Sequence, residues 1–191
     1  CIIPVLDGSA GPMLVDQVQK LELDIPPLFF NEITGPRSNV LLALLDEIVP
    51  PDDTQAEELY MLELGVHDGM NAQQVLNVRP QVQYIGVDTW DHKILKDCDK
   101  CSADYVKNIS RDAHSRLRSL NATLLQQTTV QAMETFPESS MDLVFIDADH
   151  RYDAVVTDFR ASIRVLSPGG VIAGHDFSAY WFETVIAVMV C

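Results

Sequence analysis

Short, almost continuous apolar runs recur from Tyr60 onward, separated by stretches with a helical period. The runs at residues 60–65, 84–88, 123–127, 143–147 and 170–174 predict strands. The stretches at residues 71–78, 103–120, 130–136 and 152–166 predict helices, and the last has Val155, Phe159 and Ile163 on one stripe. Strands that are apolar on both faces are typical of a parallel sheet covered on each side. The pattern therefore predicts an α/β fold, a doubly wound and mostly parallel sheet with helices on both faces in a three-layer sandwich.

The first part of the chain lacks this alternation. Residues 1–37 hold five of the ten prolines and show no clean period, so we expect an irregular arm. Residues 40–49 predict a short apolar helix with Ser38 as its N-cap. We therefore expect an arm and a helix over residues 1–55 and one domain over residues 56–191.

The two ends of the chain suggest a piece of a longer protein. The sequence starts at Cys1 without a methionine, which predicts a fragment or a processed form. The pattern stops within a last predicted helix at residues 183–191. If the fold itself ends there, an exposed sheet edge would favour pairing with a second copy of the chain.

The acidic balance narrows the class of partner. A formal net charge of -15 over 191 residues repels phosphate backbones and anionic membranes, so we expect neither nucleic acid nor a membrane as partner. No run reaches the roughly 20 apolar residues that a membrane span needs, and no secretory signal is visible. We expect a cytoplasmic protein.

A glycine turn follows the first predicted strand of the domain. Gly65 and Gly69 bracket this turn, where glycine lets the backbone bend and approach a ligand closely. The chain has neither the G-x-G-x-x-G of dinucleotide sites nor a phosphate-binding GxxxxGK[ST] loop, so a ligand without phosphates fits better. Asp88 closes the next strand, where a carboxylate can accept hydrogen bonds from both hydroxyls of a ribose.

These features resemble a known family of enzymes. The segment Glu63-Leu-Gly-Val-His-Asp-Gly69 resembles the first motif of class I S-adenosylmethionine-dependent methyltransferases, and Asp88 lies where that family carries its ribose-binding acid. Residues 145–153 and 166–177 resemble a subgroup of small-molecule O-methyltransferases related to macrolide-sugar and catechol enzymes. The resemblance extends over about residues 60–188 and implies a Rossmann-like fold with S-adenosylmethionine as cofactor.

The resemblance also implies a set of cofactor-binding residues. Glu63, Gly65 and residues 67–69 would line the methionine end of the cofactor, and Asp88 would hold the ribose. Thr89 and Trp90 would lie beside the adenine, with Thr129 near it. Thr129 stands where the family usually has serine. The full set is Glu63, Gly65, His67, Asp68, Gly69, Asp88, Thr89, Trp90, Thr129 and Asp147.

The chemical end of the site is expected at the two last strands. Asp147 and Asp176 lie at the tips of neighbouring predicted strands and suit a hard divalent cation such as Mg²⁺. His150 resembles the residue that takes the acceptor's proton in metal-dependent relatives, so we expect His150 and Asp147 to be catalytic. His175 replaces a common carboxylate and favours Zn²⁺, Mn²⁺ or Fe²⁺ over Mg²⁺. A metal at Asp147, His175 and Asp176, and a metal-free site with His150 or His175 as base, both stay open.

The main interpretation is therefore methyl transfer from S-adenosylmethionine to a hydroxyl of a small molecule, and other interpretations compete with it. An NAD-linked oxidoreductase could use a similar sheet, although the missing G-x-G-x-x-G argues against it. A non-catalytic nucleoside-binding relative would more readily have lost one of the chemical residues. Asp147 could simply cap the following helix. Cys98 and Cys101 form a lone CxxC in a polar loop, which we interpret as two exposed thiols. The aromatic residues Trp90, Tyr180, Trp181 and Phe182 could line an acceptor pocket or belong to the core.

Overall fold

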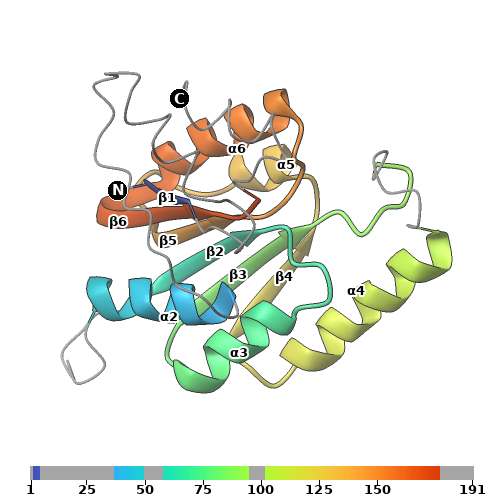
Figure 1. Ribbon diagram of the computed structural model, residues 1–191, viewed down its shortest axis with the longest axis horizontal. Helices are drawn as coiled ribbons and strands as arrows, with labels where there is room; N and C mark the ends of the chain where they lie inside the picture. Colours follow the sequence, from blue (N-terminus) through green and yellow to red (C-terminus); the bar gives the residue numbers. More distant parts are fainter. Residues whose placement is uncertain (1, 5–36, 50–57, 95–101, 177–191) are drawn as a thin grey trace, which may run out of the picture.

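A computed structural model describes residues 2–4, 37–49, 58–94 and 102–176 of the chain (Figure 1). Its elements are β1 (Ile2–Pro4), α2 (Arg37–Ile48), β2 (Tyr60–Leu64), α3 (Met70–Val78), β3 (Gln83–Asp88), α4 (Ala103–Leu117), β4 (Ala122–Gln126), α5 (Thr129–Met133), β5 (Met141–Ile146), α6 (Tyr152–Val165) and β6 (Leu166–Gly174). The predicted last helix at 183–191, the aromatic residues 180–182 and the cysteines Cys98 and Cys101 lie outside the described residues.

The strands form one six-stranded sheet in the order β1-β6-β5-β2-β3-β4, and every neighbouring pair is parallel. Helices α2, α3 and α4 cover one face, and α5 and α6 cover the other (Figure 1). The predicted three-layer α/β fold is confirmed. Each predicted strand and helix from residue 60 to residue 174 is present with its ends shifted by a few residues.

Alternation along the central strands divides the apolar side chains between two cores. On β5, Leu143 and Phe145 face the helices α2 to α4, whereas Val144 faces α5 and α6. Successive side chains of a strand point to opposite faces, so apolar residues at every position fill both layers. The continuous apolar runs in the sequence are explained by this double burial.

Two expectations about the N-terminal part need correction. Residues 1–37 were expected to be irregular, but Ile2–Pro4 form β1 and pair with β6, Ile2 lying opposite Ile172. This short strand lies along one edge of β6. Pairing with a second copy of the chain through a sheet edge stays a prediction. Ser38 is not an N-cap, because α2 already begins at Arg37, and the Ser38 hydroxyl instead donates a hydrogen bond to the side chain of Gln74 at 2.7 Å.

Residues 167–170 form an irregularity inside the strand β6. Met141 of β5 pairs with Leu166, and Leu143 pairs with Val171, so β6 advances five residues while β5 advances two. Gly169, with φ of 89°, lies in this excess segment. Pro168 and the glycines Gly169 and Gly170, residue types that favour turns, thus produce a bulge that leaves the strand continuous.

Among the described residues no helix is both long and apolar enough to cross a membrane.

The chain reverses its direction of travel across the sheet between β2 and β5. The strands β2, β3 and β4 follow one another outward, and the chain then returns to place β5 on the other side of β2. In open α/β sheets, ligands bind at the carboxyl ends of the two strands that flank such a switch point. Gly65 follows β2 at this place with φ of 93°, and a Cβ built on it would lie 2.0 Å from the carbonyl oxygen of Asp147.

Gly65→Ala is expected to destabilise the protein by more than about 3 kcal/mol, because a methyl group would both overlap the Asp147 backbone and force a left-handed residue. Gly169→Ala is the matched control, since its φ is 89° and its Cβ would meet nothing within 4 Å. That variant should lose only about 1–2 kcal/mol. Urea unfolding of both variants measures the difference, and equal losses would contradict this account of Gly65.

One buried acid lies between the helices of the second layer. Asp158 of α6 is only 2% exposed, and the Thr129 hydroxyl at the start of α5 donates a hydrogen bond to it. Burial raises the pKa of Asp158 to about 6, against the lowering effect of the Thr129 hydrogen bond, and the charge of Asp149 raises it further. The folded protein therefore binds this proton more tightly than the unfolded chain does.

It follows that the favourable contribution of Asp158 is present below its unfolded pKa of about 4 and is lost as the pH rises through about 6. Asp158→Asn, which resembles the protonated form, should be more stable than the wild type by about 2 kcal/mol at pH 8. At pH 4 the advantage should largely vanish. Urea unfolding of both proteins at the two pH values tests this, and a pH-independent difference would contradict it.

Candidate functional site

The carboxyl ends of the central strands lie in register and bring the predicted site residues to one edge of the sheet. The Asp147 amide donates to the carbonyl of Leu64 at 2.8 Å, and the His175 amide donates to the carbonyl of Ile146 at 2.9 Å. The ends of β2, β5 and β6 are thereby tied to one another. Gly65, Asp147 and His175 consequently occupy neighbouring positions at the switch point.

Asp88, at the end of β3, is bonded to the backbone of the glycine loop. Its Oδ2 accepts from the amides of Val66 at 3.1 Å and His67 at 2.9 Å, and its Oδ1 accepts from the amide of Trp90 at 2.9 Å. A carboxylate has about four acceptor positions, so three are filled and about one remains for a ligand. Asp88 therefore fixes the loop in addition to any contact it makes with a cofactor.

His67 and Trp90 are held together on the same side of that loop. His67 has φ of 54° and Trp90 has φ of 40°, both in the left-handed region that non-glycine residues rarely adopt. The indole Nε1 of Trp90 donates to the His67 carbonyl at 2.8 Å, and its ring, only 6% exposed, packs against His114 of α4. The His67 imidazole projects toward Tyr105, whose hydroxyl lies 3.0 Å from Nε2. His114 supports the loop through this ring contact.

Asp68 and Gly69 connect the loop to the helices around it. The Asp68 side chain accepts from the amide of Met70 at 3.1 Å and lies 3.5 Å from the guanidinium of Arg116. A Cβ on Gly69 would lie 3.1 Å from the Cα of Ala113, so α4 packs directly on this turn. The glycine loop is thus confined between β3 and α4.

Glu63 lies beneath the loop and is almost inaccessible, with 2% exposure. Its Oε2 accepts from the Tyr84 hydroxyl at 2.5 Å, and its Oε1 accepts from the Asn71 amide at 2.8 Å. Burial raises the pKa of Glu63 to about 7, although both hydrogen bonds act to lower it. Glu63 therefore shapes the floor of the site through protein contacts on both of its oxygens.

The two threonines of the predicted set lie at the ends of β3 and β4. The Thr89 carbonyl accepts from the Gln126 side chain at 3.2 Å. Thr129 is the first residue of α5, after Thr128, whose hydroxyl caps the helix. The Thr129 hydroxyl is bonded to Asp158 on α6, so its side chain faces the helical layer.

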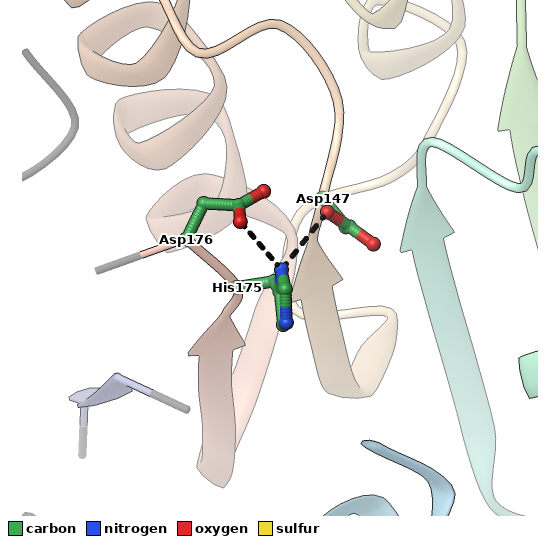
Figure 2. Close-up of side chains that lie close together, drawn as sticks. All are labelled: Asp147, His175 and Asp176. Carbon is green, nitrogen blue, oxygen red and sulfur yellow. Dashed lines mark ion pairs between the residues drawn. The ribbon is translucent and has the colours of Figure 1, made fainter. Parts of the chain in front are cut away.

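Asp147, His175 and Asp176 form a compact cluster where β5 and β6 end (Figure 2). One potential ligand atom from each lies within 4.8 Å of the others. His175 Nδ1 is 2.9 Å from Asp176 Oδ1 and 3.6 Å from Asp147 Oδ1. Asp147 also forms an ion pair through Oδ2 with the guanidinium of Arg37, the first residue of α2.

His150 joins this cluster through Asp176. Its Nε2 lies 2.5 Å from Asp176 Oδ2. Burial lowers the pKa of His150, but the hydrogen bond and the charge of Asp176 outweigh it, so the pKa of His150 is raised. Burial likewise acts to raise the pKa of Asp176, yet His150 and His175 beside it hold that pKa well below its usual range. Asp176 therefore remains an anion that orients His150.

The cluster has the donor set of a divalent cation site. His175 Nδ1 is buried and lacks a hydrogen bond of acceptable geometry, although two carboxylates flank it. Burial raises the pKa of Asp147, with Arg37 and His175 opposing the rise. An unsatisfied buried nitrogen between two carboxylates fits a metal ion that accepts one nitrogen and two oxygen ligands. The residues present are thus compatible with such an ion.

Sequence reasoning missed three participants in this site. Arg37, Asn71 and Tyr84 contact Asp147 or Glu63, but none belongs to a recognisable motif. Tyr84 is one of the strand residues facing the layer of α2 to α4, and the pattern identified it only as core. A buried acid such as Glu63 does predict nearby hydrogen-bond donors, which was the available signal for Tyr84 and Asn71.

Comparison with known proteins adds independent information. Residues 62–177 match the family described as methyltransferase domain. An uncharacterized protein of Sinorhizobium fredii is 30% identical over 122 residues, which cover 61% of this chain and 13% of that protein. An uncharacterized protein of Acanthamoeba polyphaga mimivirus is 21% identical over 132 residues, covering 66% of this chain and 55% of the relative. The chain therefore spans only part of these two relatives.

Solved structures agree on the fold. A precorrin-6y C5,15-methyltransferase from Geobacter metallireducens superposes with a TM-score of 0.52 and 16% identity, covering 78% of this chain and 66% of that one. A probable spermidine synthase from Corynebacterium glutamicum superposes with a TM-score of 0.50 and 19% identity, covering 71% of this chain and 46% of the other. The match over residues 62–177 includes the glycine loop, Asp88 and the whole cluster at β5 and β6, and the chain belongs to the methyltransferase-domain family.

Proposed function

We propose that the protein transfers the methyl group of S-adenosylmethionine to a hydroxyl group of a small molecule. The observation that carries this proposal is the convergence at one switch point of the glycine loop, Asp88 and the His150–Asp176 pair. A cofactor cradle and a positioned base then face the same space. The family membership supports methyl transfer, and the choice of a hydroxyl acceptor rests on the base.

The cofactor would lie over the loop between Gly65 and Gly69. Bound S-adenosylmethionine supplies an electrophilic methyl group. Gly65 lets the backbone pass close to Asp147 without a side chain in the way. Asp88 has room for about one further hydrogen bond, so it can accept one ribose hydroxyl while it still holds the loop. A second ribose hydroxyl would have to replace one of the loop amides.

His150 is the residue best placed to accept the acceptor's proton. A hydroxyl is a weak nucleophile and must lose its proton as it attacks, which a positioned base accelerates by about 10²–10⁴-fold. Asp176 bonds Nε2 of His150, fixes the orientation of the ring and stabilises its protonated form. We expect the imidazole of His150 to take the acceptor's proton as the oxygen attacks.

Asp147, His175 and Asp176 would hold a divalent cation if one is used. A cation there lowers the pKa of a hydroxyl that approaches it and helps to align the acceptor. Because one ligand is a histidine, Mn²⁺, Fe²⁺ or Zn²⁺ suits the site better than Mg²⁺.

Binding of S-adenosylhomocysteine, measured by calorimetry, tests the cofactor. Asp88→Ala should weaken binding about 10- to 100-fold, because a hydrogen bond to a charged group is lost and the loop is loosened. Asp142→Ala is the matched control, since Asp142 also accepts from a backbone amide, that of Tyr60, but at the opposite end of the sheet. Its affinity should equal that of the wild type.

A ribose analogue separates the two roles of Asp88. The wild type should bind 2′-deoxy or 3′-deoxy S-adenosylhomocysteine more weakly than the parent compound. Asp88→Ala should bind one of these analogues as tightly as it binds the parent compound. Equal discrimination by both proteins would leave Asp88 as a loop residue only. Failure of the folded wild type to bind S-adenosylhomocysteine would overturn the proposed function.

His150→Gln tests the base. With catechol and glycosylated macrolides as trial acceptors and radiolabelled S-adenosylmethionine as donor, kcat should fall by about 10²–10⁴-fold. The affinity for S-adenosylhomocysteine should not change, because His150 acts on the acceptor. An unchanged kcat would exclude His150 as the base. Methylation of amines but not of any hydroxyl compound would refute the choice of acceptor.

A further inference from the structure

We propose that Arg37 is a built-in cation of the site, which competes with a divalent metal ion for the carboxylate of Asp147. This inference rests on the proposed metal site. It assigns to α2 a role at the catalytic edge that neither the sequence motifs nor the family match provides, since Arg37 lies 25 residues before the matched segment of residues 62–177.

The contact is specific in its geometry. The guanidinium Nη1 of Arg37 meets Oδ2 of Asp147, across 110 residues of sequence. Asp147 is 12% exposed, whereas Arg37 is 47% exposed, so the cation approaches from the solvent side and closes over a nearly buried anion. Among the residues that the structure describes, Asp147 is the hydrogen-bond and ion-pair partner of Arg37.

Asp147 also contributes one of the three side chains of the proposed metal site. Among the described residues it is one of only three acids and histidines that could share an ion, with His175 and Asp176. Its Oδ1 faces His175 Nδ1 at 3.6 Å while its Oδ2 is paired with Arg37. A divalent ion drawn to this cluster would stand beside the guanidinium, and two cations around one carboxylate repel each other. Metal entry therefore favours departure of Arg37.

Arg37 can leave without unfolding its helix. Leu41 and Leu45 of α2 are fully buried against the sheet, and Ser38 is bonded to Gln74 of α3. At the other end of α2, Arg79 forms an ion pair with Asp46 at 2.7 Å. These anchors hold α2 independently of Arg37, so its first side chain is free to exchange partners and a substitution there should leave the fold intact.

When no metal is bound, the Arg37–Asp147 ion pair supplies positive charge to the acids of the site. Arg37 opposes the rise in the pKa of Asp147 and of Glu63, which burial would otherwise leave as two poorly compensated acids. The metal and the guanidinium thus supply the same kind of charge to the same carboxylate. Their binding free energies are coupled, and the coupling must be reciprocal.

Titration of the whole chain with Mn²⁺, followed by calorimetry, tests the competition. Arg37→Gln should bind Mn²⁺ about ten- to hundredfold more tightly than the wild type. Arg111→Gln is the matched control, because it removes the same charge from an exposed site on α4, where Arg111 pairs with the adjacent Asp112. Its Mn²⁺ affinity should equal that of the wild type.

The NMR signal of the Arg37 Nε–H group provides a second readout that does not depend on activity. Saturating Mg²⁺ or Zn²⁺ should shift this signal in the wild type, because the guanidinium leaves Asp147, whereas the corresponding signal of Arg111 should not move. Equal Mn²⁺ affinity of the wild type and Arg37→Gln, no binding to either, or an unmoved Arg37 signal would overturn the competition. Calorimetry with S-adenosylhomocysteine on the same samples reports separately whether the proposed function fails.

Discussion

The close approach of two backbones at the switch point governs the rest of the structure. Gly65 passes so near the Asp147 carbonyl that no side chain fits between them. The same approach aligns the ends of β2 and β5, and through the amide of His175 it aligns β6 as well. Asp147 and His175 directly follow the ends of β5 and β6. The distance between these two residues is therefore set by the hydrogen bonds of the sheet rather than by loop conformation.

Charge around the site is arranged as an alternating series. Arg37, Asp147, His175, Asp176 and His150 follow one another, each beside a neighbour of opposite or titratable character. Buried charges are tolerated only when they are paired, so a change at one member is transmitted to the next. A small acidic domain can therefore hold two nearly buried carboxylates close together at the carboxyl edge of its sheet.

Local sequence determined most of the fold and the chemical part of the site. Apolar runs identified the strands β2 to β6 of the described part of the chain. The residues immediately after them, such as Asp88 and Asp147, could be assigned to one edge because parallel strands end together. What the sequence could not predict depends on contacts between distant segments. Arg37 meets Asp147 only after the fold has formed, and a three-residue strand at Ile2–Pro4 has too few residues to show a period. Ser38 illustrates the ambiguity of a polar residue near a helix start, where a cap and a contact with a neighbouring helix look alike.

The pairing of β1 with β6 has a consequence for the order of folding. Ile2 lies opposite Ile172, so two neighbouring strands of the sheet lie far apart in the sequence. Contacts of such long sequence separation form late, because a large loop must close before they yield any stabilisation. On the ribosome β1 emerges long before β6, and the edge of β6 that pairs with β1 stays open until the two strands meet. In that interval the edge can pair with another nascent chain. A chaperone, or slow dilution during refolding, should therefore reduce pairing between chains most at this late step.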